Sequence, residues 1–302
     1  MTSPPSTGQT ISPRFVNADW NFWPDGFDRP GIWRECARLG FDAMEVGVYR
    51  ADEELSAAAM GAIEALASET GLGVEAVLFS MPAERWPDGG LASPSASACA
   101  AAEIAETARR AADLGAQVLG VWPGADLAAG GDPSGSGHAG GDHGDGTSDG
   151  WARTLDAIDA VAAAAEPLGL TVAVEYKPGQ LVAGADDALR LAETLGRPAV
   201  GVLVDTAHAL AGGEDLASLP ARCGPRLMHV HLGDSGGDAD ADLPPGSQHD
   251  FVPFLAGLAA IGYSGVLSFD LYGAVQAGVA TGSEASDQSL RYIRTAQTGV
   301  SW

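Results

Sequence analysis

The amino-acid sequence predicts a single (β/α)8 TIM barrel, an α/β fold, and three features of the 302-residue chain support this prediction. Eight short apolar segments alternate with Ala-rich amphipathic stretches, which is the order of strands and helices in α/β proteins. The segments are apolar along their whole length and mostly rich in β-branched residues or Leu, as expected of parallel strands buried on both faces. The chain is also long enough for a closed barrel of roughly 250 residues in one domain.

The expected strands are separated by one helix each. They are Arg14–Ala18, Ala43–Val48, Val74–Phe79, Val118–Val121, Thr171–Glu175, Val200–Asp205, Arg226–His231 and Gly265–Asp270. The expected helices cover about 31–39, 53–70, 97–114, 150–167, 185–195, 214–223, 250–261 and 284–297. Several end in a glycine, which favours a helix C-terminus: Gly40, Gly71, Gly115 and Gly262. An open doubly wound sheet is the alternative, but no Gly-rich phosphate loop follows the first strand.

Three segments fall outside this rhythm. Residues 1–12 are rich in Ser, Thr and Pro and are expected to be a disordered tail, which leaves 13–302 as the catalytic barrel domain. Residues 124–150, with His138 and His143, are otherwise mostly Gly, Asp, Ser and Ala and predict a flexible loop insertion on the catalytic face, with a lid as the alternative. Residues 233–246 form an acidic loop after the seventh strand, with aspartates at positions 234, 238, 240 and 242.

Composition excludes several classes of partner. The net charge is −24, with 40 acidic and 16 basic residues, so nucleic acid and anionic membranes are poor candidates. No apolar run approaches the roughly 20 residues that span a bilayer, and the start of the chain lacks the apolar core of a secretory signal. We therefore expect a cytoplasmic protein. Its three cysteines, Cys36, Cys99 and Cys223, do not suggest a disulfide framework.

Four consecutive expected strands end in a carboxylate or an imidazole: Glu175, Asp205, His231 and Asp270. The C-terminal strand ends of such a barrel converge on one site. Three carboxylates brought together there would repel one another and lose solvation, and a divalent cation would relieve both costs. Mostly oxygen ligands favour Mn2+, with Mg2+, Co2+ or Zn2+ as other candidates.

Histidines and a lysine lie next to these four positions. His229, two residues before His231, is expected to support the site from deeper in the barrel or to pack there. His208, three residues after Asp205, is expected to contact substrate or to bind a second metal, with a simple helix-start role as the alternative. Lys177, two residues after Glu175, would face the same side and could stabilise a developing alkoxide, or be a surface lysine.

Two tryptophans follow the first strand on the expected catalytic face. Trp20 and Trp23 would stack on a sugar face or on a flat aglycone, or would pack beneath the loop. The sequence alone does not distinguish these roles.

Together these positions make a recognisable pattern. Glu175, Asp-x-x-His at 205–208, His-x-His-x-x-Asp at 229–234, Asp270 and the stretch Phe-Asp-Ala-Met-Glu45 resemble the sugar phosphate isomerase/epimerase superfamily. These are xylose isomerase-like barrels, among them ketose 3-epimerases, inosose isomerases and dehydratases, and L-rhamnose isomerase. The resemblance covers nearly the whole chain. It implies that the four strand-end residues bind the metal, that Glu175 and Asp270 transfer protons, and that His208 and Glu45 lie at the substrate. It also implies a dimer or tetramer, with a hetero-oligomer left open.

The chain departs from the epimerase pattern at the eighth strand and after the seventh. Asp270 stands where the epimerases usually have Glu, as in L-rhamnose isomerase, and the Glu-x-Lys of Glu175 and Lys177 is similar to that enzyme too. That resemblance would make Asp238 and Asp240 ligands of a second metal with His208, against the alternative of a solvated acidic loop. The arginine that epimerases carry after the seventh strand is replaced by Gly and Asp, which argues against a phosphorylated substrate and against ketose-type binding.

The expected reaction is proton abstraction next to a carbonyl of a small-molecule sugar or sugar derivative, through a metal-stabilised enediolate. Isomerisation or epimerisation would result. Elimination from the same intermediate, as in a dehydratase or a lyase acting on a keto-glycoside, is the main alternative, and an inactive sugar-binding subunit is another. An endonuclease of the apurinic-site class shares this barrel but uses many histidines, whereas this chain has six.

Overall fold

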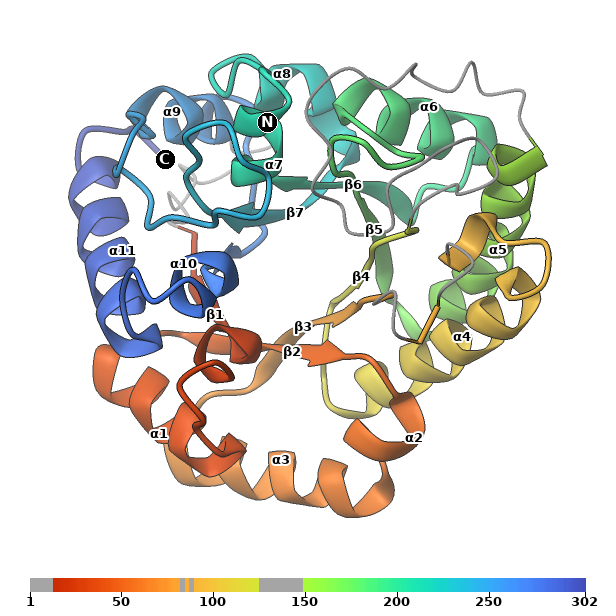
Figure 1. Cartoon of the computed structure of the whole chain (residues 1–302), viewed down its shortest axis with the longest axis horizontal. Coiled ribbons are helices and arrows are strands. Elements are labelled where there is room, and N and C mark those ends of the chain that lie inside the picture. Colours follow the sequence, from red (N-terminus) through yellow and green to blue (C-terminus); the bar gives the residue numbers. More distant parts are fainter. Residues whose placement is uncertain (1–12, 82–84, 87–89, 125–148) are drawn as a thin grey trace, which may run out of the picture.

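Eight parallel strands close into a barrel in sequence order in the computed structural model, which describes residues 13–81, 85–86, 90–124 and 149–302 (Figure 1). The strands are β1 Phe15–Ala18, β2 Ala43–Val48, β3 Val74–Phe79, β4 Val118–Val121, β5 Thr171–Glu175, β6 Val200–Asp205, β7 Leu227–Leu232 and β8 Leu267–Phe269. Pairing of Val16 with Ser268 closes the ring between β1 and β8. The predicted fold class is confirmed, and the predicted bounds of β2 to β6 match those of the structure.

The helices lie outside the barrel or cover its C-terminal end. They are α1 Arg29–Leu39, α2 Ala51–Glu54, α3 Ala57–Thr70, α4 Ser97–Asp113, α5 Asp149–Ala165, α6 Ala185–Leu195, α7 Thr206–Ala211, α8 Leu219–Cys223, α9 Val252–Ala260, α10 Tyr272–Gln276 and α11 Gly282–Gln297. The single helix predicted over 53–70 is wrong, because Ser56 caps a new helix by accepting a hydrogen bond from Ala59 N. The short helices α7 and α10 were not predicted, since each has too few residues to show a period.

Small side chains inside the barrel allow the strands to close around a packed interior. Ala18, Ala76 and Ala173 line it beside Leu78 and Leu203. Gly120 on β4 is required there, because a Cβ atom at this position would lie 2.7 Å from the Leu78 side chain. This apolar layer leaves the polar groups to the C-terminal end of the strands, where the chain bears its ionisable residues.

Two expectations concern residues outside those described. The predicted tail, 1–12, and most of the predicted insertion, residues 125–148, lie outside the residues that the structure describes. Among the described residues, no helix is both long and apolar enough to cross a membrane.

Candidate metal centre at the C-terminal end of the barrel

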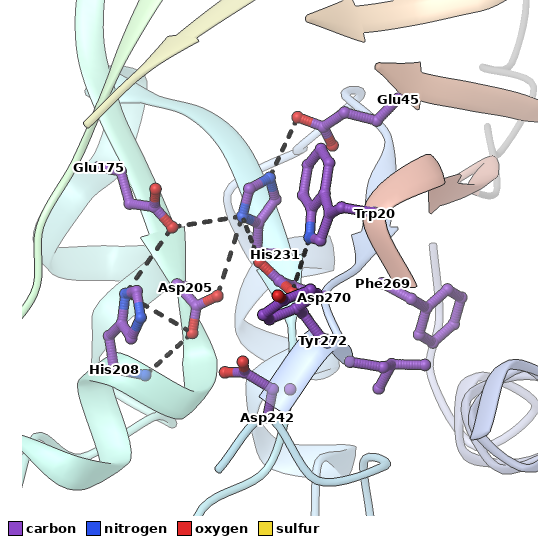
Figure 2. A network of polar contacts seen from close by, with 12 residues as sticks. Trp20, Glu45, Glu175, Asp205, His208, His231, Asp242, Phe269, Asp270 and Tyr272 are labelled. Atoms are coloured by element: carbon purple, nitrogen blue, oxygen red, sulfur yellow. Dashed lines mark hydrogen bonds and ion pairs between the residues drawn. The ribbon is translucent and has the colours of Figure 1, made fainter. Parts of the chain in front are cut away.

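Glu175, Asp205, His231 and Asp270 meet at one point at the C-terminal end of the barrel. Each offers one ligand atom, and these four atoms lie within 4.8 Å of one another. His231 Nδ1 is 3.4 Å from Glu175 Oε1 and 3.8 Å from both Asp205 Oδ2 and Asp270 Oδ2 (Figure 2). The pairing of Asp205 with His231 shows why they meet, since β6 and β7 end level with each other.

The cluster has the spacing and the unpaired atoms that a divalent ion would need. With bonds of about 2.1 Å, neighbouring ligand atoms of an octahedral ion lie about 3.0 Å apart and opposite ones about 4.2 Å. The three distances from His231 Nδ1, 3.4, 3.8 and 3.8 Å, fall in this range. Asp205 Oδ2 and His231 Nδ1 are fully buried and have no hydrogen-bond partner among the described residues. Unpaired buried polar atoms are costly, so these residues fit a bound cation.

The two carboxylate oxygens of Asp205 have different roles. Its Oδ1 accepts a hydrogen bond of 2.9 Å from His208 N and so caps the N-terminus of α7. Its Oδ2 points into the cluster and has no hydrogen-bond partner in the described part of the chain. The cap fixes the side chain, which leaves the second oxygen held in place as a ligand.

Glu45 lies behind the cluster, against the far side of His231. Its carboxylate contacts His229 Nε2 at 3.0 Å and His231 Nε2 at 3.2 Å, and all three side chains are fully buried. Both oxygens of Glu45 are occupied by imidazoles, so these contacts favour a supporting role, while the predicted substrate contact of Glu45 stays a prediction. A carboxylate on the far nitrogen of a metal-binding histidine orients the ring and makes it a better ligand.

The buried imidazole and carboxylates shift one another's protonation. Burial lowers the pKa of His231, but Glu45 and Glu175 outweigh this and hold that pKa well above its ordinary value. Burial raises the pKa of Glu175, yet His231, His208 and Lys177 more than offset it, so this pKa lies below its usual range. Burial, together with the charges of the neighbouring carboxylates, raises the pKa of Asp270 to about 6.

Trp20 is buried and contacts two residues of the cluster. Its indole N–H donates a hydrogen bond of 2.9 Å to Asp270 Oδ1, and its ring is buried against His231. Trp23, by contrast, is half-buried and meets Tyr49 edge to face, with ring centroids 5.4 Å apart. Of the two predicted stacking residues, only Trp23 keeps part of its ring exposed.

Lys177 and His208 lie on the β5 and β6 side of the cluster. Lys177 Nζ forms a close ion pair with Asp240 of the acidic loop. Burial lowers the pKa of Lys177, but the charges of Asp240, Asp242 and Glu175 raise it by more than this. The net pKa therefore lies above its ordinary value, and the lysine stays charged. His208 Nδ1 lies 3.0 Å from the Tyr176 carbonyl oxygen, which can only accept, so Nδ1 carries the proton.

In the acidic loop, the two aspartates considered for a second metal make other contacts. Asp240 is paired with Lys177, while exposed Asp238 accepts a hydrogen bond from Asp240 N. Within the described ranges, no group of three candidate ligands includes His208, Asp238 or Asp240. The residue of this loop that lies at the cluster is Asp242, which sequence reasoning did not single out. Burial and the charges of Asp270 and Asp205 raise its pKa well above the ordinary value.

Asp19, directly after β1, is another buried carboxyl group, and its burial predicts a pH-dependent stability. It is 1% exposed and accepts one hydrogen bond, 3.0 Å from Gly47 N. Burial raises its pKa to about 7. The folded state therefore retains a proton that the unfolded chain loses above about pH 4, so this group lowers stability as the pH rises from about 4 to about 7.

Asp19→Asn is accordingly expected to leave stability unchanged near pH 4 and to raise it at pH 8 by up to about 4 kcal/mol. Urea unfolding of both proteins at the two pH values, with a chelator present, measures this difference. Asp42→Asn is the control, because Asp42 is exposed and also accepts a backbone N–H, that of Phe15. An equal gain at both pH values would show that Asp19 is not protonated in the folded state.

Fold and site together define a (β/α)8-barrel protein with a candidate divalent-metal centre. The chain belongs to the family described as xylose isomerase-like TIM barrel, which it matches over residues 33–296. It is 31% identical over 120 residues to inosose dehydratase of Geobacillus kaustophilus (strain HTA426), a match covering 39% of each chain. It is 33% identical over 130 residues to ketose 3-epimerase of Arthrobacter globiformis, covering 42% of this chain and 43% of that one. These matches therefore span about two fifths of the relatives' length.

Solved structures extend the likeness of fold to nearly the whole chain. A D-tagatose 3-epimerase-like protein superimposes with a TM-score of 0.74 over 95% of this chain and all of that one, at 18% sequence identity. At this identity the likeness shows the fold alone.

Proposed function

We propose that this chain is a divalent-metal-dependent isomerase or epimerase of a small-molecule sugar or sugar derivative, with Mn2+ as the favoured ion. The observation that carries the proposal is the meeting of Glu175, Asp205, His231 and Asp270, with two buried ligand atoms left unpaired. Membership of a xylose isomerase-like family supports it, as do relatives that include an isomerase, an epimerase and a dehydratase.

Glu175 and Asp270 are the proposed proton-transfer pair. The ion, held by the four residues, would polarise the substrate carbonyl and stabilise the negative charge that develops on its oxygen. Glu175 takes the proton from the adjacent carbon, and Asp270 gives a proton back to the substrate. Exchange of protons with solvent would then restore both carboxyl groups for the next turnover.

Lys177 and His208 assist this pair in the proposal. Lys177 lies close enough to Glu175 for its positive charge to lower the pKa of that carboxyl group. The same charge would stabilise negative charge that develops on a substrate oxygen beside Glu175. His208 Nδ1 donates to the Tyr176 carbonyl oxygen and lies 3.7 Å from Glu175 Oε1, so the ring is held beside the base, where its other nitrogen would be available to a substrate hydroxyl. Trp23 offers a partly exposed ring for the carbon face of a sugar.

Elimination is the second candidate function, and the inosose dehydratase relative favours it. Loss of a proton next to the carbonyl would be followed by departure of a hydroxyl or a glycosidic oxygen from the next carbon. Isomerisation keeps the composition of the substrate, whereas elimination removes water or an alcohol. Mass spectrometry of the product therefore separates the two.

Solvent exchange tests the proposal independently of the final product. The Mn2+-loaded protein is incubated in D2O with ketohexoses, an inosose and 3-keto-glycosides. We expect deuterium at the carbon next to the carbonyl of at least one compound, and loss of exchange when the ion is chelated. Exchange in none of them, with Mn2+, Mg2+, Co2+ or Zn2+, would contradict the proposal. Sugar binding without exchange would instead identify an inactive binding subunit.

A further inference from the structure

Asp242 is a strained residue at the edge of the candidate metal centre. Its φ angle is 37°, the only positive φ of a non-glycine residue among those described. Positive φ crowds the Cβ atom of an L-residue and costs free energy. Strain of this kind persists only where the surrounding structure imposes it, and it is concentrated at functional sites.

Contacts to two other elements impose this conformation. Asp242 Oδ2 accepts a hydrogen bond of 3.0 Å from Gly273 N at the start of α10. A Cβ atom at Gly273 would lie 1.9 Å from the Asp240 carbonyl oxygen, so the loop sits directly on this glycine. The ion pair between Lys177 and Asp240 ties the same loop to the segment that follows β5. Asp242 is thus held between two strand ends of the site.

Asp242 lies beside two other carboxylates of the cluster. Its carboxylate lies on the side of the cluster away from Glu45, near Asp205 and Asp270 (Figure 2). Lys177 is the only lysine of the chain, and it is already paired with Asp240. An ion bound by Glu175, Asp205, His231 and Asp270 would already have its charge offset by three carboxylates. The carboxylate of Asp242 would be a fourth, and hydrogen-bond donors brought by a ligand would stabilise it most.

Hydroxyl groups of a polyol are such donors. The fully buried Asp205 Oδ2 and His231 Nδ1, both without a hydrogen-bond partner among the described residues, fit the proposed ion, and a sugar bound at that ion would bring its hydroxyl groups to this side of the cluster. On the basis of the proposed function, we propose that Asp242 is a further substrate-contacting carboxylate, which accepts a hydrogen bond from a hydroxyl next to the reacting carbons. It would select polyhydroxylated substrates and disfavour phosphorylated ones, whose charge it would repel.

Two substitutions separate this role from a structural one. Asp242→Gly removes the carboxylate and relieves the positive φ, and Asp242→Asn keeps the shape and the acceptor for Gly273 N. Asp238→Asn is the control, because it makes the same charge change at an exposed position of the same loop. The measurements are melting temperature, Mn2+ content, and kcat and KM for the keto sugar that exchanges best in D2O.

We expect both Asp242 variants to melt at or above the wild-type temperature and to keep their Mn2+, while kcat/KM falls about 10- to 100-fold. Asp238→Asn should match the wild type. One deoxy analogue of the active sugar should lower kcat/KM of the wild type by a similar factor. The same analogue should lower kcat/KM of Asp242→Asn only slightly below the value that this variant has with the parent sugar. This coupling would not arise from a structural role.

Three results would overturn the inference. Variants with lowered melting temperatures and wild-type kcat/KM would make Asp242 a structural residue. A second Mn2+ per chain that Asp242→Asn removes would make it a metal ligand. Absence of both exchange and sugar binding in the wild type would remove the proposed function and this inference together, whereas an active wild type with unaffected variants would remove the inference alone.

Discussion

Replacing Glu175 by glutamine is expected to reduce solvent exchange and turnover by at least about 10³-fold. Glutamine fills the same space but cannot take a proton, and general bases contribute about 10²- to 10⁴-fold to such rates. Glu175 also offers Oε1 to the cluster, so the amide weakens the metal site as well. Assays at excess Mn2+, with the bound metal measured in parallel, separate the loss of the base from the loss of the ion.

Glu214→Gln is the control for this change. Glu214 is a partly buried glutamate that accepts a hydrogen bond from the Tyr176 hydroxyl and pairs with Arg222, away from the cluster. This variant should keep its activity even if it loses some stability. A Glu175→Gln protein that retains its metal and near-full turnover would show that another group removes the proton.

Asp205→Asn is expected to weaken Mn2+ binding by at least about 100-fold, equivalent to about 2.8 kcal/mol. The asparagine Oδ1 still accepts the hydrogen bond from His208 N, so α7 keeps its cap. The other terminal atom becomes an amide nitrogen, which directs its hydrogens toward the cation in place of a charged oxygen. Calorimetric titration of the metal-free proteins with Mn2+ measures the change.

The metal-free Asp205→Asn protein should be at least as stable as the wild type, because it removes one of the mutually repelling carboxylates. Asp28→Asn is the matched control, since Asp28 caps α1 through Gly31 N, far from the cluster. Unchanged Mn2+ affinity in Asp205→Asn would mean that the ion, if it binds, is held elsewhere.

Much of the barrel and the four candidate ligands could be predicted because they depend on local pattern and on one property of the fold. Apolar runs identify strands, and parallel strands of a closed barrel all end at the same rim. A carboxylate or imidazole at four successive strand ends must therefore meet its neighbours. The structure brings Glu175, Asp205, His231 and Asp270 within reach of one another for this reason.

Features that depend on register between distant segments were missed. The β2–β3 pairing shifts between Met44 and Glu45, and strand alternation alone does not show that Glu45 faces two histidines on the opposite side of the barrel. A charged residue in a fully buried strand was the available signal that it needed buried partners. The hydrogen bond from Trp20 to Asp270 spans 250 positions and leaves no trace in local sequence.

The role of Asp242 was hidden for a different reason. Four aspartates in a Gly-rich loop look alike in the sequence, and only the backbone conformation distinguishes one of them. Asp234 folds the loop back by accepting hydrogen bonds from Gln248 N and His249 N. Asp240 pairs with Lys177, and Asp242 is left to face the cluster.

Anomalous diffraction from crystals soaked in Mn2+ tests the central claim most directly. The account predicts one strong peak per chain, at about 2.0–2.3 Å from one atom each of Glu175, Asp205, His231 and Asp270. A peak between Glu45, His229 and His231, which is the other candidate cluster among the described residues, would contradict it. So would the absence of any peak at the C-terminal end of the barrel in crystals that hold Mn2+ elsewhere.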